Sequence, residues 1–80
     1  RAQVFVSLKT KDMSGALAVL KKKFDDVRME DESIRVYDVD DTESIVAYLL
    51  RNGHTVSKIK KNKIGLEEYY IELMSAKEGK

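Results

Sequence analysis

The chain opens with apolar residues at alternating positions, followed by apolar residues at helical spacing. Residues 2–9 read AQVFVSLK, in which every second residue from Val4 to Leu8 is aliphatic. This period of two predicts a strand with one buried face. In residues 12–24 the large apolar residues Met13, Leu17, Leu20 and Phe24 follow at steps of four, three and four, which predicts one stripe of a helix. Asp12 is a suitable N-cap for that helix.

The middle of the chain predicts a hairpin and a second helix. Residues 26–30 and 33–39 have strand-like patterns, with a polar turn between them. Asp40 precedes Glu43 by three residues, which is the spacing of a capping box. We therefore expect a helix at about residues 41–52.

The pattern of the last predicted strand is irregular. It follows Gly53, a suitable C-terminal stop for the preceding helix in the left-handed conformation, and covers residues 54–60. Val56 and Ile59 are three residues apart, so we expect a bulge or an early end of the strand. The next stretch is expected to be a loop that carries three lysines, Lys60, Lys61 and Lys63.

These elements predict one small domain. A last helix is expected from about residue 65 to residue 76, with residues 77–80 as a frayed tail. The order β-α-β-β-α-β with right-handed crossovers predicts an α+β fold over residues 1–76. That fold is a ferredoxin-like sandwich with an additional C-terminal helix.

One face of the predicted sheet needs a cover. If Val6 and the residues that alternate with it face the helices, then Phe5, Tyr37 and Val39 point to the opposite, open face. Apolar surface of this extent is expected to be covered by the terminal helix, by another domain or by a second copy of the chain. The predicted interaction surface has five members, Phe5, Tyr37, Val39, Glu68 and Tyr69.

Composition and charge restrict the chemistry of the chain. Cysteine is absent, so neither a disulfide nor a thiolate metal site can form. The absence of disulfides in so small a domain fits a reducing compartment. The formal net charge is only +1, which does not give the large positive field expected of a nucleic-acid binder. The longest apolar run is too short to span a bilayer.

Motifs for catalysis or metal binding are not found in the sequence. Neither GxxxxGK[ST] nor GxGxxG occurs, and the four glycines are scattered. An EF-hand loop counted from Asp38 would have Glu43 and Leu49 at its sixth and twelfth positions, where glycine and glutamate are needed. His54 is expected to lie at the surface without a partner. We therefore predict no catalytic, cofactor or metal residues in this chain.

The second half of the chain is more distinctive. Residues 45–53 form a helix that ends in a glycine turn, Val56 and Ile59 mark the next strand, and residues 66–70 read LEEYY. This series resembles the end of the ATP-binding subunits of bacterial ABC transporters, especially of the bacitracin- and lantibiotic-export type. That family often has serine before the LE pair, whereas this chain has Gly65.

The resemblance implies an accessory or regulatory domain that works by contact. ATP and Mg²⁺ would bind an upstream domain of the parent protein, and no functional residue of that domain is carried over to this chain. The implied partners are that nucleotide-binding domain, a second ATPase subunit and a membrane permease, and a homodimer is also considered. The implied location is cytoplasmic, at the inner face of the cell membrane. A chain that begins with Arg1 rather than Met fits a fragment.

Three other functions are known for the same topology. An ACT-like small-molecule sensor, the main alternative, usually has glycine in the turn after the first strand, and residues 9–12 have none. An acylphosphatase needs an arginine-bearing anion loop at the same place, where this chain has only lysines. An RRM stacks RNA bases on aromatic residues of its central strands, but residues 33–39 hold one aromatic and no glycine.

Overall fold

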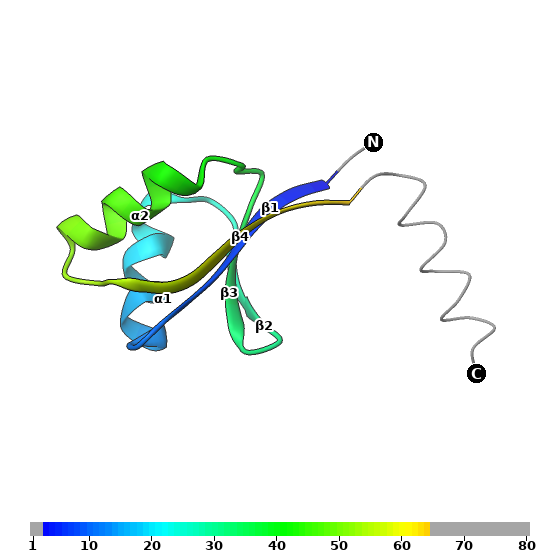
Figure 1. The fold of residues 1–80 in the computed structure, drawn as a ribbon. Helices are drawn as coiled ribbons and strands as arrows, with labels where there is room; N and C mark the ends of the chain where they lie inside the picture. Colours follow the sequence, from blue (N-terminus) through cyan, green and yellow to red (C-terminus); the bar gives the residue numbers. More distant parts are fainter. Residues whose placement is uncertain (1–2, 65–80) are drawn as a thin grey trace.

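The computed structural model describes residues 3–64, which form a four-stranded antiparallel sheet and two helices (Figure 1). The elements in chain order are β1 (Gln3–Thr10), α1 (Met13–Lys23), β2 (Val27–Glu30), β3 (Ser33–Tyr37), α2 (Thr42–Arg51) and β4 (Val56–Ile64). The predicted α+β class and element order are confirmed for these residues. Neither helix in this part of the chain is long and apolar enough to cross a lipid bilayer. The predicted terminal helix at 65–76 and the tail at 77–80 lie outside the described residues.

The strands lie in the order β2-β3-β1-β4, and all neighbours are antiparallel. Each helix therefore connects two strands that do not pair with each other. The connection through α1 passes over β3, and the connection through α2 passes over β1. Figure 1 shows both helices on the same side of the sheet. The opposite face of the sheet is left open by α1 and α2.

The core lies between the helices and one face of the sheet. In β1 the predicted alternation is confirmed, since Val6 and Leu8 are fully buried there. Burial of an aliphatic side chain of this size stabilises the fold by about 2 kcal/mol relative to exposure. The buried cluster consists of Val6, Leu8, Ala16, Leu20, Val27, Ile34, Val36, Ile45 and Leu49. The two helices are also joined directly, because the Tyr48 hydroxyl donates to the Val19 carbonyl at 3.0 Å.

Both helices begin at an aspartate. Asp12 caps α1 as predicted, with its Oδ1 accepting from the Gly15 backbone N–H at 3.0 Å. A Cβ at position 15 would overlap this carboxylate, so a larger residue there would require the Asp12 side chain to shift. The predicted Asp40 capping box of α2 is wrong. The N-cap is Asp41, which accepts from the Ser44 N–H at 3.2 Å, because the helix begins one residue later than the box requires.

The strand β4 is longer than predicted. Lys60, Lys61 and Lys63 were expected in a loop, but the strand continues to Ile64, whose partner is Gln3 of β1. Backbone pairing with β1 extends the strand where the side chains give no apolar alternation. β4 forms one edge of the sheet, and these lysines therefore lie along that edge.

The bulge expected in β4 is confirmed, and the alternative of an early end is wrong. The pairing register shifts between Lys9 and Thr10 of β1, so that β4 has one extra residue, Ser57, between their partners. Because of this insertion, Val56 and Ile59 both pack against the core although they are three residues apart.

The strand β3 ends two residues earlier than predicted. Asp38 has a φ of 63°, a left-handed conformation that aspartate tolerates better than most residues. Its N–H donates to the Val4 carbonyl at 2.8 Å. The change of direction ends the alternation of β3, so Val39 packs against the core. The prediction that Val39 points to the open face is therefore wrong.

Candidate functional site on the open face of the sheet

Two aromatic rings occupy the middle of the open face. Phe5 of β1 and Tyr37 of β3 are direct cross-strand partners, and their ring centroids are 5.1 Å apart. This placement agrees with the prediction from the pleat. The rings are nevertheless almost inaccessible, because Phe5 is 5% exposed and Tyr37 is 7% exposed. Side chains of the same face must therefore cover them.

Two arginines provide that cover. The guanidinium carbon of Arg35 lies 4.8 Å from the Phe5 ring centroid, and that of Arg28 lies 4.5 Å from the Tyr37 centroid. A guanidinium over an aromatic ring is attracted to its face and also shields the ring from water. We call these four residues the arginine–aromatic cluster.

Arg28 is fixed by a carboxylate at the start of β2. Its Nε and Nη2 donate to the two oxygens of Asp26 at 2.8 and 2.9 Å, which is a bidentate arrangement. These hydrogen bonds lower the pKa of Asp26 below its ordinary value. The same bonds raise the pKa of Arg28. The orientation of the guanidinium over Tyr37 is thus set by a paired charge.

Arg35 is fixed from the hairpin between β2 and β3. Its Nη1 lies 3.1 Å from Glu30 Oε1, and its Nη2 lies 3.1 Å from Asp31 Oδ2. Its Nη1 also donates to the Tyr37 hydroxyl at 3.3 Å, and this hydrogen bond raises the pKa of Arg35 more strongly than burial lowers it. The Nε of Arg35 is buried without a hydrogen-bond partner among the described residues. The two Nη groups of Arg35 are therefore paired with carboxylates within the domain, whereas its Nε is not.

The hairpin turn itself positions one of these carboxylates. Asp31 and Glu32 are its two central residues, with φ angles of 52° and 63°. Positive φ at both central positions is the geometry of a type I′ turn, which matches the twist of the flanking strands. The turn places Asp31 beside Arg35 although the two residues are four apart in sequence.

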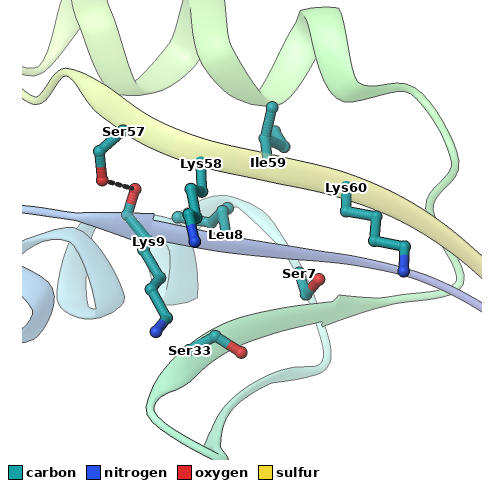
Figure 2. Close-up of a pocket in the computed structure, with 8 residues that line it drawn as sticks. All are labelled: Ser7, Leu8, Lys9, Ser33, Ser57, Lys58, Ile59 and Lys60. Atoms are coloured by element: carbon teal, nitrogen blue, oxygen red, sulfur yellow. Dashed lines mark hydrogen bonds between the residues drawn. The ribbon is translucent and has the colours of Figure 1, made fainter.

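The half of the face formed by β1 and β4 has a different character. Lys9 and Lys58 are direct cross-strand partners, and Lys60 follows two residues later on the same face, opposite Ser7. We call Lys9, Lys58 and Lys60 the lysine strip. Figure 2 shows their side chains around one pocket. No carboxylate of residues 3–64 forms an ion pair with any of the three.

The lysine strip borders an open groove with a volume of about 510 Å³. Its lining is formed by Ser7, Leu8, Lys9, Ser33, Ser57, Lys58, Ile59 and Lys60 (Figure 2). The Ser57 hydroxyl donates to the Lys9 carbonyl at 3.0 Å, across the bulge. Ser7 Oγ accepts from Asn62 Nδ2 at 3.1 Å, which leaves its own hydroxyl hydrogen available. Ammonium and hydroxyl donors together make this groove suited to anionic groups.

A smaller, apolar groove lies between α2 and β4. It has a volume of about 300 Å³, and Val46, Leu50, Val56 and Ile59 contribute its apolar lining. Leu50 is 55% exposed, which is high for leucine. This groove lies along α2, and Lys58 of the lysine strip contributes to its lining as well.

The predicted interaction residues are only partly brought together. Phe5 and Tyr37 share the open face, but the two arginines cover them. Val39 lies on the other side of the sheet, against the core. Glu68 and Tyr69 lie outside the described residues. An interaction role for these five residues stays a prediction.

The sequence-based prediction missed the charged residues of the face. Arg35 stands two positions before Tyr37 in a predicted strand, so the pleat alone places both on one face. Lys58 and Lys60 alternate in the same way, but Lys60 was assigned to a loop. The Asp26–Arg28 pair joins residues two apart in sequence, so the pleat alone allows it. The pairs of Arg35 with Glu30 and Asp31 depend on the hairpin between β2 and β3.

The other candidate side chains have structural roles. Among the described residues, no group of three or more His, Cys, Asp or Glu side chains is placed to hold a metal ion. Asp41, in the acidic stretch, caps α2. The backbone N–H of His54 donates to the Leu49 carbonyl at 2.9 Å, which places this residue in the turn after α2.

The open face thus consists of a half that is closed by its own ion pairs and a half with a groove bordered by lysines.

Comparison of the chain with protein-family models, with curated proteins and with solved structures finds no significant match.

Proposed function

We propose that this chain is a ferredoxin-like accessory domain of the ATP-binding subunit of a bacterial ABC transporter that exports antimicrobial peptides or drugs. In this proposal the domain makes contacts between domains or subunits and takes no part in ATP chemistry. ATP and Mg²⁺ bind the upstream nucleotide-binding domain. The partners are that domain, a second ATPase subunit and the permease, at the cytoplasmic face of the membrane.

The observation that carries the proposal is the unit formed by α2, Gly53 and β4. Gly53 has a φ of 84°, and its N–H donates to the Leu50 carbonyl at 3.1 Å, which ends α2 in a glycine turn. The bulge in β4 then lets Val56 and Ile59 pack on the core side, next to α2. Residues 45–59 of the family-like series thus belong to one supersecondary unit, which supports the resemblance, whereas the LEEYY stretch lies outside the described residues.

The sheet order gives further support to the fold assignment. The order β2-β3-β1-β4 with two helical crossovers on one side is compatible with the split βαβ arrangement of ferredoxin-like domains. Such a sheet leaves one face available for contacts with other domains.

The reading frame that contains residues 1–80 tests the proposal first. It is expected to encode a phosphate loop and an LSGGQ-like signature upstream of Arg1. If both are present, deletion of this domain should leave the ATPase activity of the upstream domain intact and reduce coupling to the permease. A reading frame without either motif would contradict the proposal.

A titration of the isolated chain with Mg-ATP tests the absence of nucleotide chemistry. We expect no localised shifts of backbone amide resonances. Localised shifts at one site would contradict a pure contact role. A rise in melting temperature with an amino acid would instead favour an ACT-like sensor, because a ligand that binds only the folded state stabilises it.

A further inference from the structure

We infer that the lysine strip is a docking site for an acidic polypeptide segment of a partner protein, in an extended conformation with Asp or Glu at alternating positions. The inference names a surface and a partner chemistry for the contact role proposed above. Its argument depends on the geometry of the open face alone, so it can succeed or fail independently of the transporter assignment.

The first argument is the pairing of like charges. Lys9 and Lys58 are directly opposite each other on neighbouring antiparallel strands, and Lys60 is the next residue on the same face. Like charges in such a position repel each other. No carboxylate within residues 3–64 forms an ion pair with them. A bound carboxylate between the two strands would relieve this repulsion, which gives the strip a preference for anions.

The second argument is the contrast with the rest of the face. The guanidinium groups of Arg28 and Arg35 are paired with Asp26, Glu30 and Asp31 inside the domain. Their charges are therefore largely compensated. The positive potential of the open face comes mainly from the lysine strip, which concentrates attraction for an anionic partner on one side.

The third argument is the spacing along the strand. Lys58 and Lys60 are two residues apart on one face of β4, and residues at this separation in a strand are about 7 Å apart. Alternate side chains of an extended peptide have the same spacing. The groove beside the strip has a volume of about 510 Å³ and presents the hydroxyl of Ser7, whereas that of Ser33 donates to the Glu30 carbonyl. A peptide laid along β1 and β4 would thus meet lysines at matching intervals.

The structure favours a polypeptide over a nucleic acid. Single strands bind by stacking bases on exposed aromatic rings, but Phe5 and Tyr37 are only 5% and 7% exposed under their arginines. The neighbouring Asp31 has a side chain that is 85% exposed and would repel a phosphate backbone. A polypeptide can place a neutral or basic residue at that point.

The test is a titration of the ¹⁵N-labelled chain with a soluble peptide of alternating Glu and Ser, at about 50 mM salt, where surface charges are weakly screened. We expect the largest amide shifts at the lysine strip and at Ser7. The double variant K58Q/K60Q is expected to bind roughly tenfold more weakly. The control K21Q/K22Q removes the same charge from the exposed end of α1 and should bind like the wild type.

The charge-reversed variant K58E/K60E tests the inference if the neutral variants change the peptide affinity too little to measure. It should lose the Glu-Ser peptide and gain binding of a Lys-Ser peptide at the same residues. Equal weakening by K21Q/K22Q and K58Q/K60Q would overturn the inference, because binding would then follow net charge alone. Tighter binding of an oligothymidylate than of the Glu-Ser peptide at the strip would overturn it in favour of a nucleic acid.

Discussion

The two halves of the open sheet face hold positive charge in different ways. On β2 and β3, Arg28 and Arg35 lie over aromatic rings and are held by carboxylates within about 3 Å. On β1 and β4, Lys9 and Lys58 face each other across the strands with no ion pair to a carboxylate among the described residues.

The difference follows from the chemistry of the two side chains. A guanidinium is planar, so it can stack on a ring and bind a carboxylate through two donors at once. An ammonium is a compact, strongly hydrated charge at the end of a flexible stem. The arginine half therefore contributes to the stability of the domain, and the lysine half is left accessible for binding. Substitutions in the two halves should separate these contributions.

The largest effect is expected for Phe5→Ala. The ring is buried beneath Arg35 and against Tyr37, so its removal should lower the free energy of unfolding by about 3–5 kcal/mol. Urea denaturation followed by circular dichroism would measure this. Lys60→Ala, a substitution on the same face, should change the midpoint of urea denaturation very little. If Phe5→Ala loses less than about 1 kcal/mol, the ring is not packed as described.

Arg35→Lys should separate charge from geometry. The substitution keeps the positive charge but loses the plane over Phe5 and the fork that contacts Glu30 and Asp31. We expect the free energy of unfolding to fall by about 1–2 kcal/mol. The reverse exchange in the other half, Lys58→Arg, should be nearly neutral. If Arg35→Lys and Lys58→Arg changed the free energy of unfolding equally, the two halves of the face would contribute equally to the stability of the domain.

Lys58→Glu should stabilise the domain slightly. It replaces the repulsion with Lys9 by an attractive cross-strand pair, worth about 0.5 kcal/mol at low salt. Added salt should reduce the gain. Lys63→Glu is the matched control, because Lys63 lies in the same strand and has Val4 as its partner. A gain of the same size for both variants would mean that net charge, rather than the pair, sets the effect.

Asp26→Asn should remove a small stabilisation at neutral pH and, with it, part of the acid dependence of stability. The hydrogen bonds from Arg28 lower the pKa of Asp26 in the folded state. The stabilisation is therefore present above the pKa of the unfolded chain and is lost as the pH falls through the lower folded pKa. Denaturation midpoints between about pH 2 and pH 6 would measure this slope, and Asn at position 26 should flatten it. The effect is small because the pair is exposed at the surface. An unchanged slope would mean that the pair is not formed in solution.

Periodicity explains which elements were predicted well. The strand β1 and the helix α1 were placed within one residue at each end, because their apolar positions repeat regularly. The far end of β4 was missed because Lys60, Lys61 and Lys63 give no alternation of apolar residues there. The strand is formed through backbone pairing with β1. Val39 was placed on the wrong face, because the left-handed conformation of Asp38 interrupts the pleat.

The candidate site was predictable only at the level of single strands. The pleat placed Phe5 and Tyr37 on the open face, which is where the structure has them. The cover over the rings requires β2, β3 and β1 in one particular register, and this register depends on a turn at Asp31 and Glu32 without the glycine that usually marks it. The lysine pair depends on the register between β1 and β4. Such long-range pairings leave no trace in local spacing.

The charged border of the sheet has one further effect. An edge strand offers unpaired backbone groups on which another chain can add a strand, a common start of aggregation. In β4 this edge carries a dense row of lysines, Lys58, Lys60, Lys61 and Lys63. Two copies that approached edge to edge would bring these ammonium groups together, so β4 should resist growth of the sheet into fibrils.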